Sequence, residues 1–227
     1  MPARRFIDLS HPIVDGMLTY PGLPAPAIRA HLSREDSRSH YAPGTEFHIG
    51  RIDMVANTGT YLDTPFHRYA GATDLAGIDL AQLADLPGLV VSATGRTDRA
   101  IIAEALATAL AGSDIAGAAV LVHTGWAEHW GTGRYFSGHP FLTADAAQWL
   151  IAQRIALCGI DSLNIDDNSG GERPVHSALL GAGIPVVEHL RGLEQLPAAG
   201  FRFSAVPAPV KGMGSFPVRA FAVVYFG

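Results

Sequence analysis

Two acids and two histidines stand where they could hold a metal ion or move protons. Asp63 and His67 are four residues apart in the densest polar cluster of the chain, which begins at Asn57. His176 and Glu188 lie further along, and Glu188 ends an apolar run. An acid buried there is costly unless it is paired or bound to a metal. The residues alone leave a plainer alternative equally open, in which His176 starts a helix and Glu188 is a solvated strand end.

Pro65 determines the backbone conformation that positions His67. A continuous helix would place Asp63 and His67 on one face, but a proline disfavours the α conformation of the residue before it. We therefore expect Thr64 to cap a new helix that begins at Pro65, with His67 in its first turn. The helix dipole there favours a neutral imidazole, which suits a general base or a metal ligand.

Composition narrows the class of protein. The chain of 227 residues is 48% apolar and 16% charged, which favours a folded core over disorder. A formal net charge of −5 argues against nucleic-acid or anionic-membrane binding, which needs a basic face. The single cysteine, Cys158, excludes an internal disulfide and a multi-cysteine zinc site, so chemistry must use imidazole and carboxylate. No membrane span or signal peptide is recognisable, and we expect a cytoplasmic protein.

The elements that must position these residues alternate between strand and helix only in the middle of the chain. Apolar runs or a period of two predict strands at residues 6–10, 47–55, 89–91, 119–122, 155–160, 185–187, 201–206 and 218–226. Helical spacing predicts one helix capped by Asp98 and ended by Gly112, and another capped by Thr143. Residues 28–46 are polar and are predicted to form an irregular loop. We predict a single α/β domain of mixed α+β type over residues 1–227, not a doubly wound sheet.

The polar cluster resembles a family signature. Its sequence is similar to the pattern His-x-Gly-Thr-His-x-Asp-x-Pro-x-His of the cyclase family, which includes bacterial kynurenine formamidases and isatin hydrolases. Gly59, Thr60, Asp63, Pro65 and His67 match this pattern. Other segments resemble the family in the same order along the chain: Asp8–Ile13, Tyr20–Gly22, Thr124–Trp126, Gly159–Ser162 and Pro217–Ala220, with His176 and Glu188 at the spacing of the later metal ligands.

The resemblance implies a swivelling β/β/α fold, a homodimer or homotetramer, and hydrolysis of a small amide, lactam or lactone by a metal-activated water. The metal would be zinc or manganese. By resemblance, Asp63, His176 and Glu188 are metal ligands, His67 is the catalytic acid and base, and Tyr20 is an aromatic residue that stacks on a small-molecule substrate.

Two positions depart from the family pattern. Asn57 and Tyr61 stand where the signature has its first two histidines. An asparagine oxygen is a weak ligand, and a tyrosine binds metals mainly as phenolate, which its ordinary pKa of about 10 disfavours. We therefore expect one divalent metal rather than two, held by three protein ligands with an open position. Tyr61 would then donate a hydrogen bond to the oxyanion, and Asn57 would contact the substrate.

A metal-free protein is the alternative. Asp63 and Glu188 would then lie close together without a cation, and the pKa of one of them should be high. With His67 and Tyr61 they could still perform acid–base chemistry. Such a relative would cyclise or isomerise its substrate, or only bind a small molecule.

Overall fold

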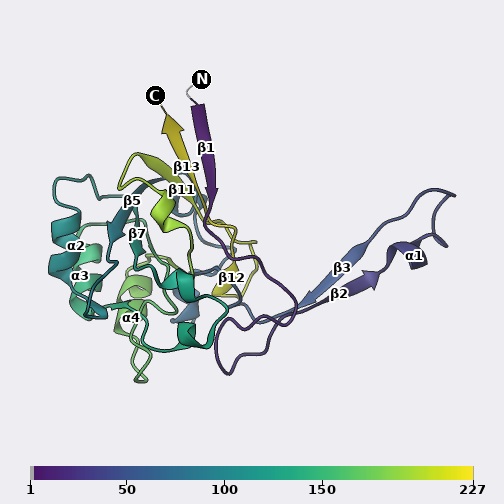
Figure 1. Ribbon diagram of the computed structural model, residues 1–227, viewed down its shortest axis with the longest axis horizontal. Coiled ribbons are helices and arrows are strands. Elements are labelled where there is room, and N and C mark those ends of the chain that lie inside the picture. Colours follow the sequence, from purple (N-terminus) through teal and green to yellow (C-terminus); the bar gives the residue numbers. More distant parts are fainter. Residues whose placement is uncertain (1–2, 227) are drawn as a thin grey trace.

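A mixed β-sheet forms the centre of the computed structural model, which describes residues 3–226 (Figure 1). Its strands are β1 (Ala3–Asp8), β4 (Tyr61–Asp63), β5 (Leu86–Ser92), β7 (Ala119–His123), β9 (Leu157–Ile160), β10 (Val186–Glu188), β11 (Phe201–Ser204), β12 (Ser215–Pro217) and β13 (Phe221–Phe226). They lie in the order β1-β13-β11-β5-β7-β9-β10-β4-β12. The pairs among β5, β7, β9 and β10 are parallel and the flanking pairs antiparallel, which confirms the predicted α+β class. Met1, Pro2 and Gly227 lie outside the described residues, and the single domain stays a prediction.

Three helices cover one face of this sheet. They are α2 (Ala103–Ala109), α3 (Ala144–Ala152) and α4 (Pro174–Gly181) (Figure 1). Leu106 and Leu150 on these helices belong to the same buried cluster as Val120 on β7. Leu121, the next residue of β7, belongs to a second cluster on the other face. The central strands are thus buried on both faces, which explains their continuous apolar runs.

Short 3₁₀ helices fill the connections. They are η1 (Pro65–His67), η2 (Leu80–Gln82), η3 (Trp126–His129), η4 (Gly133–Phe136) and η5 (Leu193–Gln195). Within residues 3–226, no helix is both long enough and apolar enough to cross a membrane.

A two-stranded arm projects from the body (Figure 1). It consists of β2 (Ala27–Leu32), α1 (Arg34–Ser37) and β3 (Ile49–Asp53), and β2 pairs antiparallel with β3. The prediction of an irregular loop over residues 28–46 is therefore wrong for β2 and α1, whereas residues 38–46 contain no helix or strand, as predicted. β2 and β3 bury neither face, so no apolar face was available to mark β2 in the sequence.

The helix predicted to be capped by Asp98 begins later, at Ala103. Residues Ala100–Ile101 instead form β6, which pairs in parallel with β8 (Phe141–Leu142). The backbone N–H of Ala103 donates to Asp145 of α3 at 3.0 Å. The cap thus comes from a neighbouring helix, and this explains why the nearest acid in the sequence was misleading.

Candidate active site

Strand register brings four polar side chains onto one face of the sheet. β4 lies between β10 and β12, with Tyr61 directly opposite Glu188 and Asp63 directly opposite Ser215. Tyr61 and Asp63 are two residues apart and share a face, while Leu62 points to the opposite face and into the core. Because residues opposite one another in an antiparallel pair also share a face, the four side chains meet.

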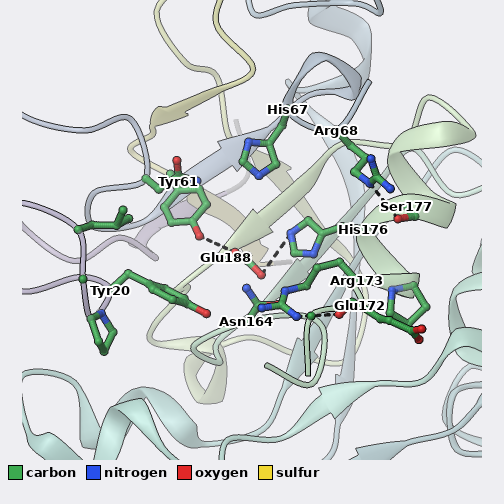
Figure 2. Close-up of a pocket in the computed structure, with 16 residues that line it drawn as sticks. Tyr20, Tyr61, His67, Arg68, Asn164, Glu172, Arg173, His176, Ser177 and Glu188 are labelled. Carbon is green, nitrogen blue, oxygen red and sulfur yellow. Dashed lines mark hydrogen bonds and ion pairs between the residues drawn. The ribbon is translucent and has the colours of Figure 1, made fainter. Parts of the chain in front are cut away.

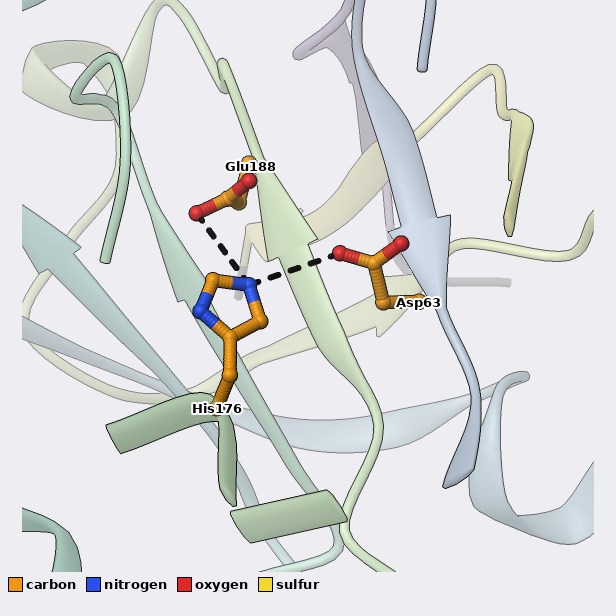
Figure 3. A group of neighbouring side chains, drawn as sticks. All are labelled: Asp63, His176 and Glu188. Atoms are coloured by element: carbon orange, nitrogen blue, oxygen red, sulfur yellow. Dashed lines mark ion pairs between the residues drawn. The ribbon is translucent and has the colours of Figure 1, made fainter. Parts of the chain in front are cut away.

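Asp63, His176 and Glu188 converge as predicted (Figure 3). The Nε2 atom of His176 lies 3.6 Å from Oδ2 of Asp63 and 3.6 Å from Oε1 of Glu188. These separations are too long for hydrogen bonds, but they match the ~3.4 Å expected between ligands of a tetrahedral ion with bonds of about 2.1 Å. Within the described part of the chain, the buried Oδ2 atom of Asp63 has no hydrogen-bond partner. The three residues therefore fit a divalent metal ion.

Asp166 orients His176. Its Oδ2 atom accepts from the His176 ring nitrogen Nδ1 at 2.7 Å and from the His176 backbone N–H at 3.0 Å. Its Oδ1 atom accepts from the backbone N–H of Val175 at 2.7 Å, which caps α4. With the Nδ1 hydrogen held by Asp166, Nε2 faces the two carboxylates as a ligand. Burial lowers the pKa of His176, but the carboxylates of Glu188, Asp166 and Asp63 outweigh it and raise the pKa well above its usual value.

Tyr61 is a hydrogen-bond donor to Glu188. Its hydroxyl lies 2.5 Å from Oε2 of Glu188, and the backbone N–H of Ile165 donates to Oε1 at 2.6 Å. Burial, followed by the charges of Glu188 and Asp63, raises the pKa of Tyr61 well above its usual value. Burial also raises the pKa of Glu188, against the opposing effect of His176. The phenol is therefore protonated in this structure and donates to the Glu188 carboxylate.

Ser215 links Asp63 to His67. The Ser215 hydroxyl donates to Oδ1 of Asp63, and its oxygen lies 2.8 Å from Nδ1 of His67. With the serine hydrogen directed to Asp63, that oxygen accepts from an Nδ1–H of His67. The Nε2 atom of His67 is then free to exchange a proton, and the His67 side chain is 38% exposed.

Gly214 allows the strand that carries Ser215 to approach this closely. A Cβ atom at Gly214 would lie 2.3 Å from the backbone nitrogen of His67. The helix that holds His67 begins at Pro65 as predicted, although it is a 3₁₀ helix of one turn. Thr64 is the N-cap residue as predicted, but its hydroxyl makes no capping bond and donates to the Gly214 carbonyl at 3.1 Å instead.

These side chains open into a cavity of about 880 Å³ (Figure 2). The predicted site residues that line it are Tyr20, Asn57, Tyr61, His67, His176 and Glu188. The structure thus brings the predicted residues together, with Asp63 packed against His176 behind the cavity wall. The roles assigned to the individual residues stay predictions.

Sequence reasoning missed Asp166 and Ser215. Ser215 follows a glycine-rich turn, and neither residue carries a local signal, because only the fold brings them to the ligands. Asp161, in the family-like segment Gly159–Ser162, accepts the backbone N–H groups of Thr124 and Gly125 at 2.7 and 2.9 Å. It therefore fixes the loop after β7.

Known proteins resemble this chain in sequence and in fold. Kynurenine formamidase from Bacillus cytotoxicus is 24% identical over 220 residues, which cover 97% of this chain and 98% of the relative. The fold matches isatin hydrolase A from Labrenzia aggregata with a TM-score of 0.84 and 24% identity, over 98% of this chain and 94% of that one. It also matches a structure described as a potential metal-dependent hydrolase with cyclase activity, with a TM-score of 0.78 and 26% identity, over 99% and 100% of the two chains. The predicted cyclase-family fold is confirmed. Since the Cyclase family model matches residues 7–167, most of the sequence, this chain belongs to the Cyclase family.

Proposed function

We propose that this chain is a hydrolase that cleaves a small amide or lactam with the help of one divalent metal ion. The observation that carries the proposal is the convergence of Asp63, His176 and Glu188, with an unpartnered carboxylate oxygen and an oriented imidazole. Its relatives include a kynurenine formamidase, an isatin hydrolase and a potential metal-dependent hydrolase. A small molecule would occupy the cavity, and the cytoplasmic location stays a prediction.

Zinc or manganese suits this donor set. Zinc accepts imidazole and carboxylate ligands together, and manganese favours carboxylate oxygens. A divalent ion in such a site supplies a nucleophile at neutral pH, because it lowers the pKa of water towards ~7. One imidazole and two carboxylates leave room for water and for the substrate carbonyl.

Residues of the chain itself would carry out the proton transfer that hydrolysis requires. Hydrolysis adds the OH of water to the carbonyl carbon and its remaining proton to the departing nitrogen, so one proton must be taken from the water and delivered to that nitrogen. His67 is positioned for both transfers, because Ser215 holds Nδ1 while Nε2 remains free. The side-chain amide of Asn57 can donate a hydrogen bond to the substrate. Tyr61 donates to Glu188 in this structure, and its predicted bond to the oxyanion stays a prediction.

Metal analysis combined with turnover tests the proposal. The protein would be loaded with Zn²⁺ or Mn²⁺, its bound metal measured by mass spectrometry, and its release of formate from an N-formyl arylamine followed. Asp63→Asn and His176→Ala should lose both metal and turnover. Glu194→Gln removes an exposed acid outside the cavity and should retain both.

The metal-free alternative gives a different result. Wild-type protein that takes up neither ion would overturn the one-metal proposal, whatever reaction it catalyses. Metal uptake without turnover of any amide or lactam would leave a binding protein of the same family.

We also propose that the chain forms a homodimer or homotetramer through the arm. The apolar side chains of Ile28, Phe47, Ile49 and Ile52 on the arm are 42–52% exposed. An isolated two-stranded ribbon is marginally stable in water, so these side chains favour burial against a second copy of the chain.

A further inference from the structure

A set of hydrogen-bond donors lies in the cavity beside the triad. Figure 2 shows the guanidinium of Arg173 next to Asn164, with the hydroxyl of Tyr20 facing them from the other side. Arg173 is the residue immediately before α4, and Asn164 follows β9. Tyr20 is the predicted stacking residue, and its hydroxyl, Arg173 and Asn164 take no part in the proposed proton transfers. Arg173 and Asn164 were not predicted from the sequence.

No carboxylate among the described residues pairs with Arg173, although Glu172 and Glu188 line the same cavity. Its hydrogen bonds within residues 3–226 all use Nη1, which donates to the backbone carbonyls of Gly170 at 2.8 Å and Glu172 at 2.7 Å, with a longer contact to Asp167 at 3.5 Å. These bonds fix the guanidinium and leave Nε and Nη2 without an acceptor among the described residues. The nearby carboxylate of Asp167 is instead paired with Arg99, at 3.7 Å.

Asn164 and Tyr20, the neighbours of Arg173 in the cavity, are also available as hydrogen-bond donors. The side-chain oxygen of Asn164 accepts from the backbone N–H of Asp166 at 2.9 Å, so its amide N–H groups remain to donate. The Tyr20 oxygen accepts a long hydrogen bond from Asn168 at 3.4 Å, which leaves the Tyr20 hydrogen free. A half-buried guanidinium with two unused donor groups, Nε and Nη2, beside neutral donors can bind an anion.

We propose that Arg173, Asn164 and Tyr20 bind a carboxylate of the substrate, so that the cavity selects an anionic amide over its neutral counterpart. This inference rests on the proposed hydrolase function, since it names the class of substrate for the same site. A planar carboxylate matches the two free donors of the guanidinium in a bidentate arrangement. Its negative charge would lie in the donor set, and the amide would extend towards the triad and His67.

Equilibrium binding tests the proposal without relying on turnover. The ligands are a matched pair, 2-aminobenzoate and 2-aminobenzamide, which differ in the carboxylate. Their dissociation constants are measured by titration calorimetry, on metal-loaded and on chelator-treated protein. Wild-type protein should bind the carboxylate at least about tenfold more tightly, with and without metal.

Variants test whether Arg173 and Tyr20 cause the preference for the carboxylate. Arg173→Gln should reduce the ratio of the two dissociation constants to near unity, and Tyr20→Phe should reduce it several-fold. Arg96→Gln, which removes an exposed arginine outside this cavity, should leave the ratio unchanged. Because Arg173 also holds a loop, Tyr20→Phe serves as the variant that removes only a hydroxyl.

The outcomes separate the two proposals. Equal binding of the pair by wild-type protein overturns the carboxylate site, and so does a preference that survives Arg173→Gln. A preference that disappears on chelation assigns the carboxylate to the metal and also overturns it. A preference that depends on Arg173 upholds the site even if no amide is hydrolysed, in which case only the proposed function fails.

Discussion

The Tyr61 hydroxyl donates a 2.5 Å hydrogen bond to Oε2 of Glu188, and both side chains are almost fully buried. The two residues are direct cross-strand partners on β4 and β10. In the family signature that this segment resembles, a histidine ligand stands at the position of Tyr61. The hydroxyl hydrogen thus satisfies a carboxylate oxygen that a second cation would otherwise neutralise, and this arrangement favours a site for one metal ion.

Restoring both histidines should therefore create a second metal site. We expect the double variant Asn57→His with Tyr61→His to bind two equivalents of Zn²⁺ where the wild type binds one, because two imidazoles are added beside the carboxylates of Asp63 and Glu188. Metal per folded chain is measured by mass spectrometry after equilibrium dialysis. The matched double variant Asn57→Gln with Tyr61→Phe changes the same positions without adding ligands and should stay at one equivalent.

An unchanged stoichiometry in the double-histidine variant, with native circular dichroism, would show that these positions do not face the metal site.

The sequence predicted the candidate metal ligands only in part from local signals, since His176 was assigned through the family resemblance. Asp63 and His67 lie in a recognisable polar cluster, and Glu188 is an acid at the end of an apolar strand. Ser215 and Asp166 have no such signal, since only the register of β12 and the turn before α4 bring them to the site.

The secondary structure, like the site, could be predicted only where the sequence carries a local pattern. Buried strands can be recognised in the sequence by their apolar runs. β2 of the arm has no buried face, so its sequence shows no pattern of apolar residues. The first residue of α2 could not be predicted from the neighbouring sequence either. Its N–H is capped by Asp145 of a neighbouring helix rather than by Asp98.

Asp166→Asn should weaken metal binding without removing a ligand. The Asp166 carboxylate holds His176 at Nδ1, and outer partners of this kind contribute roughly 10- to 100-fold to metal affinity. We expect a loss of that size in a competition titration with a fluorescent zinc chelator. Asp167→Asn is the matched control, because the neighbouring acid pairs with Arg99 and not with His176. Equal losses in both variants would argue for a general effect of charge.

Ser215→Ala should slow turnover more than it reduces metal content. Loss of the hydroxyl frees the ring of His67 from its anchor to Asp63, and general acid–base catalysis depends on that orientation. We expect kcat to fall roughly 10- to 100-fold, with a shifted pH profile and about one metal ion still bound. Ser10→Ala removes another buried serine hydroxyl, which donates to the backbone carbonyl of Val218, and should leave kcat nearly unchanged. A normal kcat in Ser215→Ala would remove Ser215 from the proton path.

Charge on the arm should dissociate the oligomer. Phe47→Asp with Ile49→Asp places two carboxylates on the apolar surface of the arm, where the side chains are 52% and 47% exposed. We expect sedimentation velocity to show a dimer or tetramer for the wild type and a monomer for this variant. Leu80→Asp alters an equally apolar position, 62% exposed, away from the arm and should keep the oligomer. A wild-type monomer would contradict the proposed assembly.

His11 should make the fold sensitive to acid. It is buried against Trp130, with ring centroids 3.9 Å apart, and Arg191 lies close to it. Burial, reinforced by the Arg191 charge, lowers the pKa of His11 from 6.5 to about 4. Between these values the unfolded chain binds a proton that the folded protein rejects, so the free energy of unfolding falls as the pH falls. The contribution of this one group approaches ~1.4 kcal/mol per pH unit within that window.

The variant His11→Phe should remove this dependence. Phenylalanine keeps an aromatic ring against Trp130 but cannot bind a proton. We expect the difference in unfolding free energy between pH 7 and pH 5, measured by urea titration, to be smaller in the variant than in the wild type by roughly 1–2 kcal/mol. Other titrating groups near this ring are present in both proteins, namely His123, Glu128, Asp161 and Glu194 around the same cavity and the buried His189. The pKa of His189 is lowered mainly by burial, with a smaller effect of His11, so these groups largely cancel in the comparison. If the two proteins lose the same stability on acidification, His11 is charged in the folded state and its burial does not control the acid response.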